Sequence, residues 1–110
     1  MIERSVLRVV PQSPVTISVR TEGGLLAFGV VANISPRGAC LFGDMGFEPG
    51  TPLQFTLSFP REGQPLEAPG RVVWVQPHRD GQMRCGLEFE ILPDDDAARL
   101  ATLVGRVAPH

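Results

Sequence analysis

Apolar and polar side chains alternate with a period of two along most of this chain, and that alternation predicts β-strands. It is most regular at 15–20, 52–59 and 82–91, where every second residue is apolar and the third stretch ends on Ile91. Such alternation is typical of strands with one face in a core and the other face in water. Less regular strands are predicted between them: 25–34, 38–43 and 66–76.

Turn signals that contain glycine separate the predicted strands. They are Glu22-Gly-Gly, Glu48-Pro-Gly, Arg61-Glu-Gly and Arg79-Asp-Gly. Six strands joined by short connections within about 80 residues favour an antiparallel barrel or sandwich. The predicted fold class is therefore all-β.

Near the C-terminus the period changes from that of a strand to that of a helix. Asp94, Asp95 and Asp96 follow Pro93, and carboxylates are favoured at the positive end of the helix dipole, so we interpret them as a helix cap. The pattern predicts a helix over 94–107 that packs on the β-structure or closes one end of it. Its apolar residues recur at helical spacing and form one stripe: Ala97, Leu100, Leu103, Val104 and Val107.

No linker, repeat or low-complexity tract divides the chain, so its 110 residues are predicted to form one domain, 1–110. Within it we expect a β-barrel or sandwich over 14–92 and the helix over 94–107. Residues 1–12 are predicted to form an N-terminal arm, and we expect this arm to be flexible before a ligand arrives.

Composition narrows the classes of function. A hydrophobic content of 43% and a net charge of -2 are typical of a folded globular protein. The longest apolar run, 25–32, falls short of the roughly 20 residues of a membrane helix, and no secretory signal follows the N-terminus. We therefore expect a cytoplasmic protein without a membrane partner. The acidic balance also argues against a general nucleic-acid binder, so no nucleic-acid partner is expected.

Catalysis and metal binding are not indicated by the sequence. His78 and His110 have no nucleophile in a recognisable arrangement, and neither a glycine-rich phosphate loop nor a metal-ligand cluster is present. Cys40 and Cys85 lie in apolar strand contexts without metal-ligand spacing, and we interpret them as buried free thiols. We expect no enzyme activity, no metal and no cofactor.

Two short motifs carry the functional signal: Arg4-x-x-x-Arg8 and Asn33-x-Ser35-x-x-Gly38. An arginine fork pairs with phosphate oxygens and with the O6 and N7 atoms of guanine. Asn33 offers a donor and an acceptor to a guanine edge, Ser35 adds a hydroxyl, and Gly38 allows a ligand or a neighbouring strand to approach closely. Without the arginines, the second motif is also typical of an Asx or Ser turn at a strand end, and both interpretations stay open.

This ordered pair of motifs resembles the ligand signature of PilZ domains, which are bacterial receptors for the second messenger cyclic di-GMP. The later segments Gly70-x-Val-x-Trp74 and Gly86-x-x-Phe89 also resemble family patterns, so the resemblance covers almost the whole chain. It implies a six-stranded antiparallel β-barrel with a C-terminal α-helix. It also implies that the arm wraps over cyclic di-GMP and that five residues bind this ligand: Arg4, Arg8, Asn33, Ser35 and Gly38.

The resemblance implies a cyclic di-GMP receptor or adaptor that signals to an unidentified protein effector through ordering of its arm. Arg37 and Trp74 are secondary candidates for ligand contacts, although Trp74 is better explained as a core residue. Asn33 stands where aspartate is frequent in the family, and Glu3 stands where many members are basic, so both bear on affinity. The alternative function is a PilZ-like protein-interaction module with a degenerate nucleotide site. A third hypothesis, a barrel that binds single-stranded nucleic acid, is disfavoured by the acidic balance and the lack of tyrosine.

Overall fold

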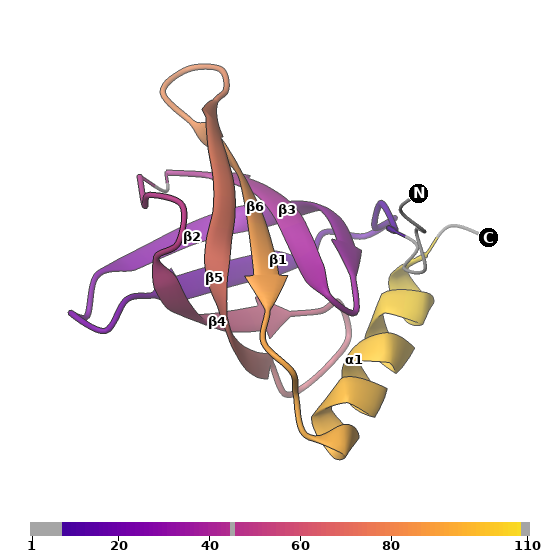
Figure 1. Cartoon of the computed structure of the whole chain (residues 1–110). Coiled ribbons are helices and arrows are strands. Elements are labelled where there is room, and N and C mark those ends of the chain that lie inside the picture. The colour runs from indigo at the N-terminus through magenta and orange to yellow at the C-terminus, as the bar shows by residue number, and fades with distance from the viewer. Residues whose placement is uncertain (1–7, 45, 109–110) are drawn as a thin grey trace, which may run out of the picture.

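The computed structural model describes residues 8–44 and 46–108, which form a β-barrel with a helix at one end (Figure 1). The predicted all-β fold with a C-terminal helix is confirmed. Nothing helical in these ranges has both the length and the apolar character of a bilayer-spanning segment. In chain order the elements are β1 (Thr16–Arg20), β2 (Leu26–Ser35), β3 (Gly38–Gly43), β4 (Pro52–Ser58), β5 (Leu66–Pro77), β6 (Met83–Phe89) and α1 (Asp94–Val107).

The six strands close into a barrel in the order β1-β2-β3-β6-β5-β4, and each neighbouring pair is antiparallel. Closure gives each of these strands two hydrogen-bonded neighbours, which leaves none of them with a free edge. Side chains alternate between the interior, which they fill in so small a barrel, and the outer surface. The outer face of the strands is therefore the surface that can meet a ligand or a partner.

The barrel interior is filled by the apolar half of each alternating strand. Ile17 and Val19 on β1, together with Phe55 and Leu57 on β4, are at most 2% exposed. Such burial stabilises each large apolar side chain by about 1.5–3 kcal/mol relative to exposure. The period-two pattern of the sequence thus translates directly into one continuous core.

Ile91 is the exception to this agreement, because it was predicted on the buried stripe of the last strand and is 100% exposed. The β6 ladder ends at Phe89, and the N–H of Glu90 donates to the carbonyl oxygen of Pro69 at 2.8 Å. Beyond that bond the chain leaves the sheet. The alternating pattern of the sequence thus extends to Ile91, although the strand that would turn this side chain into the core ends at Phe89.

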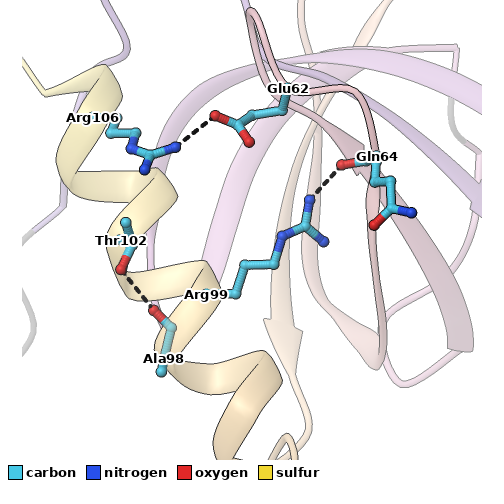
Figure 2. Close-up of polar contacts among 6 residues, drawn as sticks. All are labelled: Glu62, Gln64, Ala98, Arg99, Thr102 and Arg106. Carbon is cyan, nitrogen blue, oxygen red and sulfur yellow. Dashed lines mark hydrogen bonds and ion pairs between the residues drawn. The ribbon is translucent and has the colours of Figure 1, made fainter.

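Helix α1 lies against one end of the barrel, and its buried residues extend the core: Leu100, Leu103, Val104 and Val107 (Figure 1). Polar contacts fasten its solvent side to the β4–β5 connection (Figure 2). Arg106 Nη1 lies 2.7 Å from Glu62 Oε2, and Arg99 donates to the carbonyl oxygens of Gln64 and Pro65. Because these contacts are exposed, the apolar stripe supplies most of the docking energy.

The helix occupies the range predicted for it, 94–107, but its start differs from the interpretation as a carboxylate cap. Pro93 is the N-cap residue, and no side chain there makes a capping hydrogen bond. The three aspartates instead form the first turn, where negative charge is favoured by the dipole without a specific bond. Proline before the first turn leaves no side-chain oxygen at the capping position.

A β-bulge in β2 decides which way the second motif faces. Val31 pairs with Leu41 and Asn33 pairs with Cys40, so Ala32 is an extra residue on the β2 side. Leu41 lies in the core, and its neighbour Cys40 therefore faces outward together with Asn33. In a regular strand without the bulge, Asn33 would lie two positions after Val31 and would share its buried orientation.

A second bulge in β5 turns the tryptophan outward as well. Val72 pairs with Leu87 and Trp74 pairs with Gly86, which leaves Val73 unpaired. A Cβ atom on Gly86 would lie 2.2 Å from the indole nitrogen of Trp74, so the ring lies directly over this glycine on the outer face. Trp74 is half-buried by that contact and does not belong to the core, so its interpretation as a core residue is wrong.

Candidate ligand-binding site

The turn between β2 and β3 contains the second motif. Ser35 and Gly38 pair across this turn. The Ser35 hydroxyl oxygen accepts a hydrogen bond from the Arg37 N–H at 3.1 Å, and the hydroxyl donates to the Gly38 carbonyl oxygen at 3.5 Å. Ser35 is also 1% exposed. Its hydroxyl therefore holds the turn, as the Ser-turn interpretation of this motif predicts.

Gly38 is required by the neighbouring strand. A Cβ atom at this position would lie 2.2 Å from the carbonyl oxygen of Leu87 on β6, and backbone cannot move aside as a flexible side chain can. Its backbone is not among those with positive φ. Glycine is therefore needed at this position because β6 approaches it closely, and not because of a positive φ. This packing brings β6 close to the turn.

The two motifs meet at Arg8 and Asn33. Arg8 Nη1 donates to Asn33 Oδ1 at 2.9 Å, across 25 positions of sequence. The backbone supports this contact, because Val9 and Ile34 exchange two hydrogen bonds of 2.8 Å each. Arg8 is exposed, so its other N–H groups are accessible from solvent.

The predicted arm is described from Arg8 onward, and Arg4 lies outside the described residues. Past Val9 the arm makes one more backbone contact, in which the Gln12 N–H donates to the carbonyl oxygen of Val107 at 3.0 Å. This short segment therefore joins the end of α1 to the Asn33 end of β2.

Two rows of outward residues cross the barrel from β2 to β5 beside this contact. In the first row Asn33, Cys40, Gly86 and Trp74 follow one another on β2, β3, β6 and β5. The second row consists of Ser35, Gly38, Glu88 and Arg71. Strands lie about 4.8 Å apart, so each row spans roughly 15 Å. The rows form a broad, shallow surface with glycine at its centre.

Arg84 adds a cation and an aromatic contact to this surface. Its guanidinium carbon lies 5.7 Å from the centre of the Trp74 ring and 5.9 Å from that of Phe42. Arg84 Nε also donates to Cys40 Sγ at 3.4 Å. The sequence places Arg84 on the outward side of β6, but only the strand register shows that it lies beside Trp74. Sequence reasoning therefore missed it.

Arg71 and Glu88 form an ion pair at the other end of the rows. Arg71 Nε and Nη2 both donate to Glu88 Oε1, at 3.1 and 2.9 Å. The two side chains line a groove of about 1010 Å³ that runs past Arg37 to the start of α1. Arg71 thus adds a cation near Gly38. No pattern in the sequence indicated this, because the pairing of Arg71 depends on the bulged register of β5.

Both cysteines are free and buried, as predicted. Burial raises the pKa of the Cys85 thiol from 9.0 to about 11, and the nearby Cys40 thiol adds to that rise. A thiol with so high a pKa remains protonated and unreactive at neutral pH. Among residues 8–44 and 46–108, no cluster of His, Cys, Asp or Glu could hold a metal ion.

The closed barrel with its C-terminal helix agrees with the comparison to known proteins. The family model described as "PilZ domain" matches residues 3–106, so this chain belongs to the PilZ domain family. The search of curated proteins found no match.

Solved PilZ structures share the fold at low sequence identity. The PilZ domain of Escherichia coli YcgR with c-di-GMP has a TM-score of 0.78 at 8% identity, with 96% of this chain and 92% of that chain covered. The MrkH–c-di-GMP complex of K. pneumonia has a TM-score of 0.77 at 16% identity, covering 94% and 52%. Bacillus subtilis MotI/DgrA, an inhibitor of motility, has a TM-score of 0.73 at 18% identity, covering 96% and 51%. This chain thus spans about half the length of MrkH and MotI.

Membership of the PilZ domain family defines the class of protein to which this chain belongs. PilZ domains are receptors and adaptors for cyclic di-GMP, and they are not enzymes. Cyclic di-GMP is a ligand of such domains and not a cofactor. The expectations of a non-enzymatic protein without a cofactor agree with this family.

Proposed function

We propose that this chain is a cyclic di-GMP receptor that binds its ligand on the outer face of the barrel, beside the β2–β3 turn. The observation that carries the proposal is the hydrogen bond from Arg8 Nη1 to Asn33 Oδ1, which brings the two signature motifs together. The similar YcgR and MrkH structures are complexes with c-di-GMP, which supports the same ligand class here.

The chemistry of the surface suits the two guanines and two phosphates of the ligand. Arg8 uses one nitrogen for Asn33, and the rest of its planar fork can bind a phosphate or the O6 and N7 atoms of guanine. We propose that Arg4 supplies a second fork. The indole face of Trp74 offers a stacking surface for a base, and Arg84 beside it offers a further cation.

Ser35 and Gly38 have an indirect part in this proposal. The Ser35 hydroxyl is used by the turn, and Gly38 is in contact with β6, so both residues shape the surface that Asn33 and the arginines use. Arg37, at the exposed tip of the same turn, is a direct contact candidate because nothing covers it in the described part of the chain.

The proposed output is a change in the arm. When ligand oxygens bind the remaining N–H groups of Arg8, the arm closes over the nucleotide, and a protein effector recognises the closed arm with the adjacent barrel surface. Ordering of residues 4–7 around the ligand belongs to this proposal, as does a cytoplasmic location. The effector remains unidentified.

Calorimetric titration with cyclic di-GMP tests the proposal. Each arginine–guanine pair is worth about 1–3 kcal/mol, so the double variant Arg4→Ala/Arg8→Ala should bind roughly 30-fold to more than 10,000-fold more weakly. Arg79→Ala, which removes an exposed arginine from the β5–β6 turn, is the matched control and should bind as the wild type does.

The same titration separates the competing functions. No heat at high micromolar ligand would support the alternative, a protein-interaction module with a degenerate nucleotide site. Oligonucleotide binding that weakens steeply with salt would instead support the single-stranded nucleic-acid hypothesis.

A further inference from the structure

One side of the barrel presents a stripe of large apolar side chains to solvent. Leu26, Phe28 and Val30 occupy successive outward positions of β2 and are 55%, 64% and 49% exposed. We call these three residues the β2 stripe. The stripe ends at the bulge that precedes Asn33. Contiguous apolar surface of this kind marks contact sites between proteins, whereas single exposed apolar residues do not.

On one side of the stripe, β1 and β4 present uncharged hydroxyl groups. Thr16 and Ser18 on β1 pair with Val30 and Phe28, and β4 continues the surface with further threonine and serine. A groove of about 490 Å³ opens here, lined in part by Phe28 and these hydroxyl residues. A partner that brought charges onto this surface would bury them without a counterion, so the matching surface must itself be apolar and largely uncharged.

Two exposed charges of opposite sign flank the stripe, one on each side of β2. Arg20 on β1 pairs in register with Leu26, while Asp44 follows β3 on the other side of β2. Within residues 8–44 and 46–108 the ion pairs are formed by other residues, so Arg20 and Asp44 have no salt-bridge partner there. A two-fold axis parallel to β2 exchanges the two flanks, which brings Arg20 of one copy to the Asp44 side of the other.

We propose that two copies of this chain associate face to face through the β2 stripe, with the Arg20 flank of each copy against the Asp44 flank of the other. The β2 stripe of a second copy is the kind of apolar, uncharged surface that the β2 stripe of the first copy can bind. The two-fold axis also brings the positive flank of each copy to the negative flank of the other. Four strands about 4.8 Å apart and five residues of about 3.4 Å each give a face roughly 15–20 Å on a side. Because that is small for a protein interface, the dimer is a weak one with a micromolar dissociation constant.

Sedimentation velocity of the full chain over a wide micromolar range tests this dimer. The wild type should shift from monomer to dimer with concentration, and Phe28→Asp should raise the dissociation constant by at least tenfold. Phe28 is mostly solvent-exposed, so this variant keeps its fold, which a thermal transition checks. Val73→Ser, which removes an exposed apolar side chain from the β5 bulge, is the matched control and should dimerise normally.

Charge reversal tests the orientation. Arg20→Asp alone should weaken the dimer, and the double variant Arg20→Asp/Asp44→Arg should restore it. A wild type that stays monomeric, or a Phe28→Asp variant that still dimerises, overturns the proposal; equal weakening in the single and double charge variants overturns the orientation. Cyclic di-GMP titration of Phe28→Asp should give wild-type affinity, so failure of the dimer and failure of the proposed receptor function are distinguishable.

Discussion

At the scale of single residues, Asn33 has a more specific role than its motif indicates. It accepts a hydrogen bond from Arg8 before any ligand is present, and it thereby positions the guanidinium group over the outer face. An aspartate at this position would add an ion pair to the hydrogen bond and hold Arg8 more strongly than the uncharged amide of asparagine does. The asparagine thus positions Arg8 without neutralising its charge.

Replacing Asn33 with alanine measures this positioning. A net hydrogen bond is worth about 0.5–1.5 kcal/mol, so Asn33→Ala should weaken cyclic di-GMP binding by roughly 2–13-fold. The melting temperature should hardly change, because the lost bond is exposed. Calorimetry beside a thermal scan checks both expectations. Unchanged affinity in a folded variant would mean that Arg8 is placed by the Val9–Ile34 bridge alone.

Gly38 is predicted to matter for stability before it matters for binding. Even the single methyl of Gly38→Ala would be forced against the Leu87 carbonyl, and such overpacking costs about 1–3 kcal/mol. Gly46→Ala, at a glycine with open space around it, is the control. Chemical denaturation should show a clear loss of unfolding free energy only in the first variant. If both variants are equally stable, the strands separate easily and Gly38 serves the ligand instead.

At the scale of elements, the centre of β6 is buried from Cys85 to Leu87, and Cys85 reports on that burial. Burial raises the pKa of this thiol to about 11 from 9.0, so the folded state keeps its proton to higher pH than the unfolded state does. The unfolding free energy should therefore be constant below about pH 9 and fall as the pH rises from about 9 to about 11.

This pH dependence can be measured cleanly because the chain contains neither lysine nor tyrosine. Urea unfolding should lose roughly 1–3 kcal/mol across that window in the wild type. Cys85→Ala lacks the thiol and should show a much flatter profile, although it is less stable throughout. An identical slope in the two proteins would place the titration elsewhere.

The positions of the strands and of the helix were predictable from the sequence. Whether particular side chains point into the core or outward was not predictable. Alternation alone located β1, β4 and β6, and helical spacing located α1, because each pattern records which face is buried. A bulge shifts the phase of the alternation by one residue, but both bulges lie in apolar runs, at 30–32 and 72–75, which hide that shift. The outward turn of Asn33 and Trp74, and the approach of Arg84 and Arg71 to the site, therefore required the strand register.

At the scale of the whole molecule, the segment from Arg8 to Gln12 connects three parts of the structure. Arg8 contacts the site, Val9 pairs with Ile34 at the end of β2, and Gln12 bonds to the last turn of α1. Any closure of the arm over a ligand starts from this attached segment. The entropy to be paid is about 1–2 kcal/mol for each further backbone residue that becomes fixed, so micromolar binding can order only a few residues.

Amide hydrogen exchange with and without cyclic di-GMP tests this description. Exchange should slow at 4–10 and at 33–38 on ligand binding and should change little in α1. The Val9 amide starts partly protected because it already donates to Ile34, so the largest change should fall before it. Equal protection of the arm in both states would show that the adaptor surface is preformed.

The bulge at Ala32 also has a consequence for inheritance. On one side of it β2 presents the apolar stripe, and on the other side the same strand presents Asn33, the proposed nucleotide contact. Loss of the single codon for Ala32 would leave Val31 directly before Asn33, so regular alternation would still turn Val31 into the core and Asn33 outward. Loss of a codon in a regular part of the strand would instead turn the residues on one side of the gap to the opposite face. The lineage can therefore shorten this strand at the bulge without exchanging its two faces, but not in its regular parts.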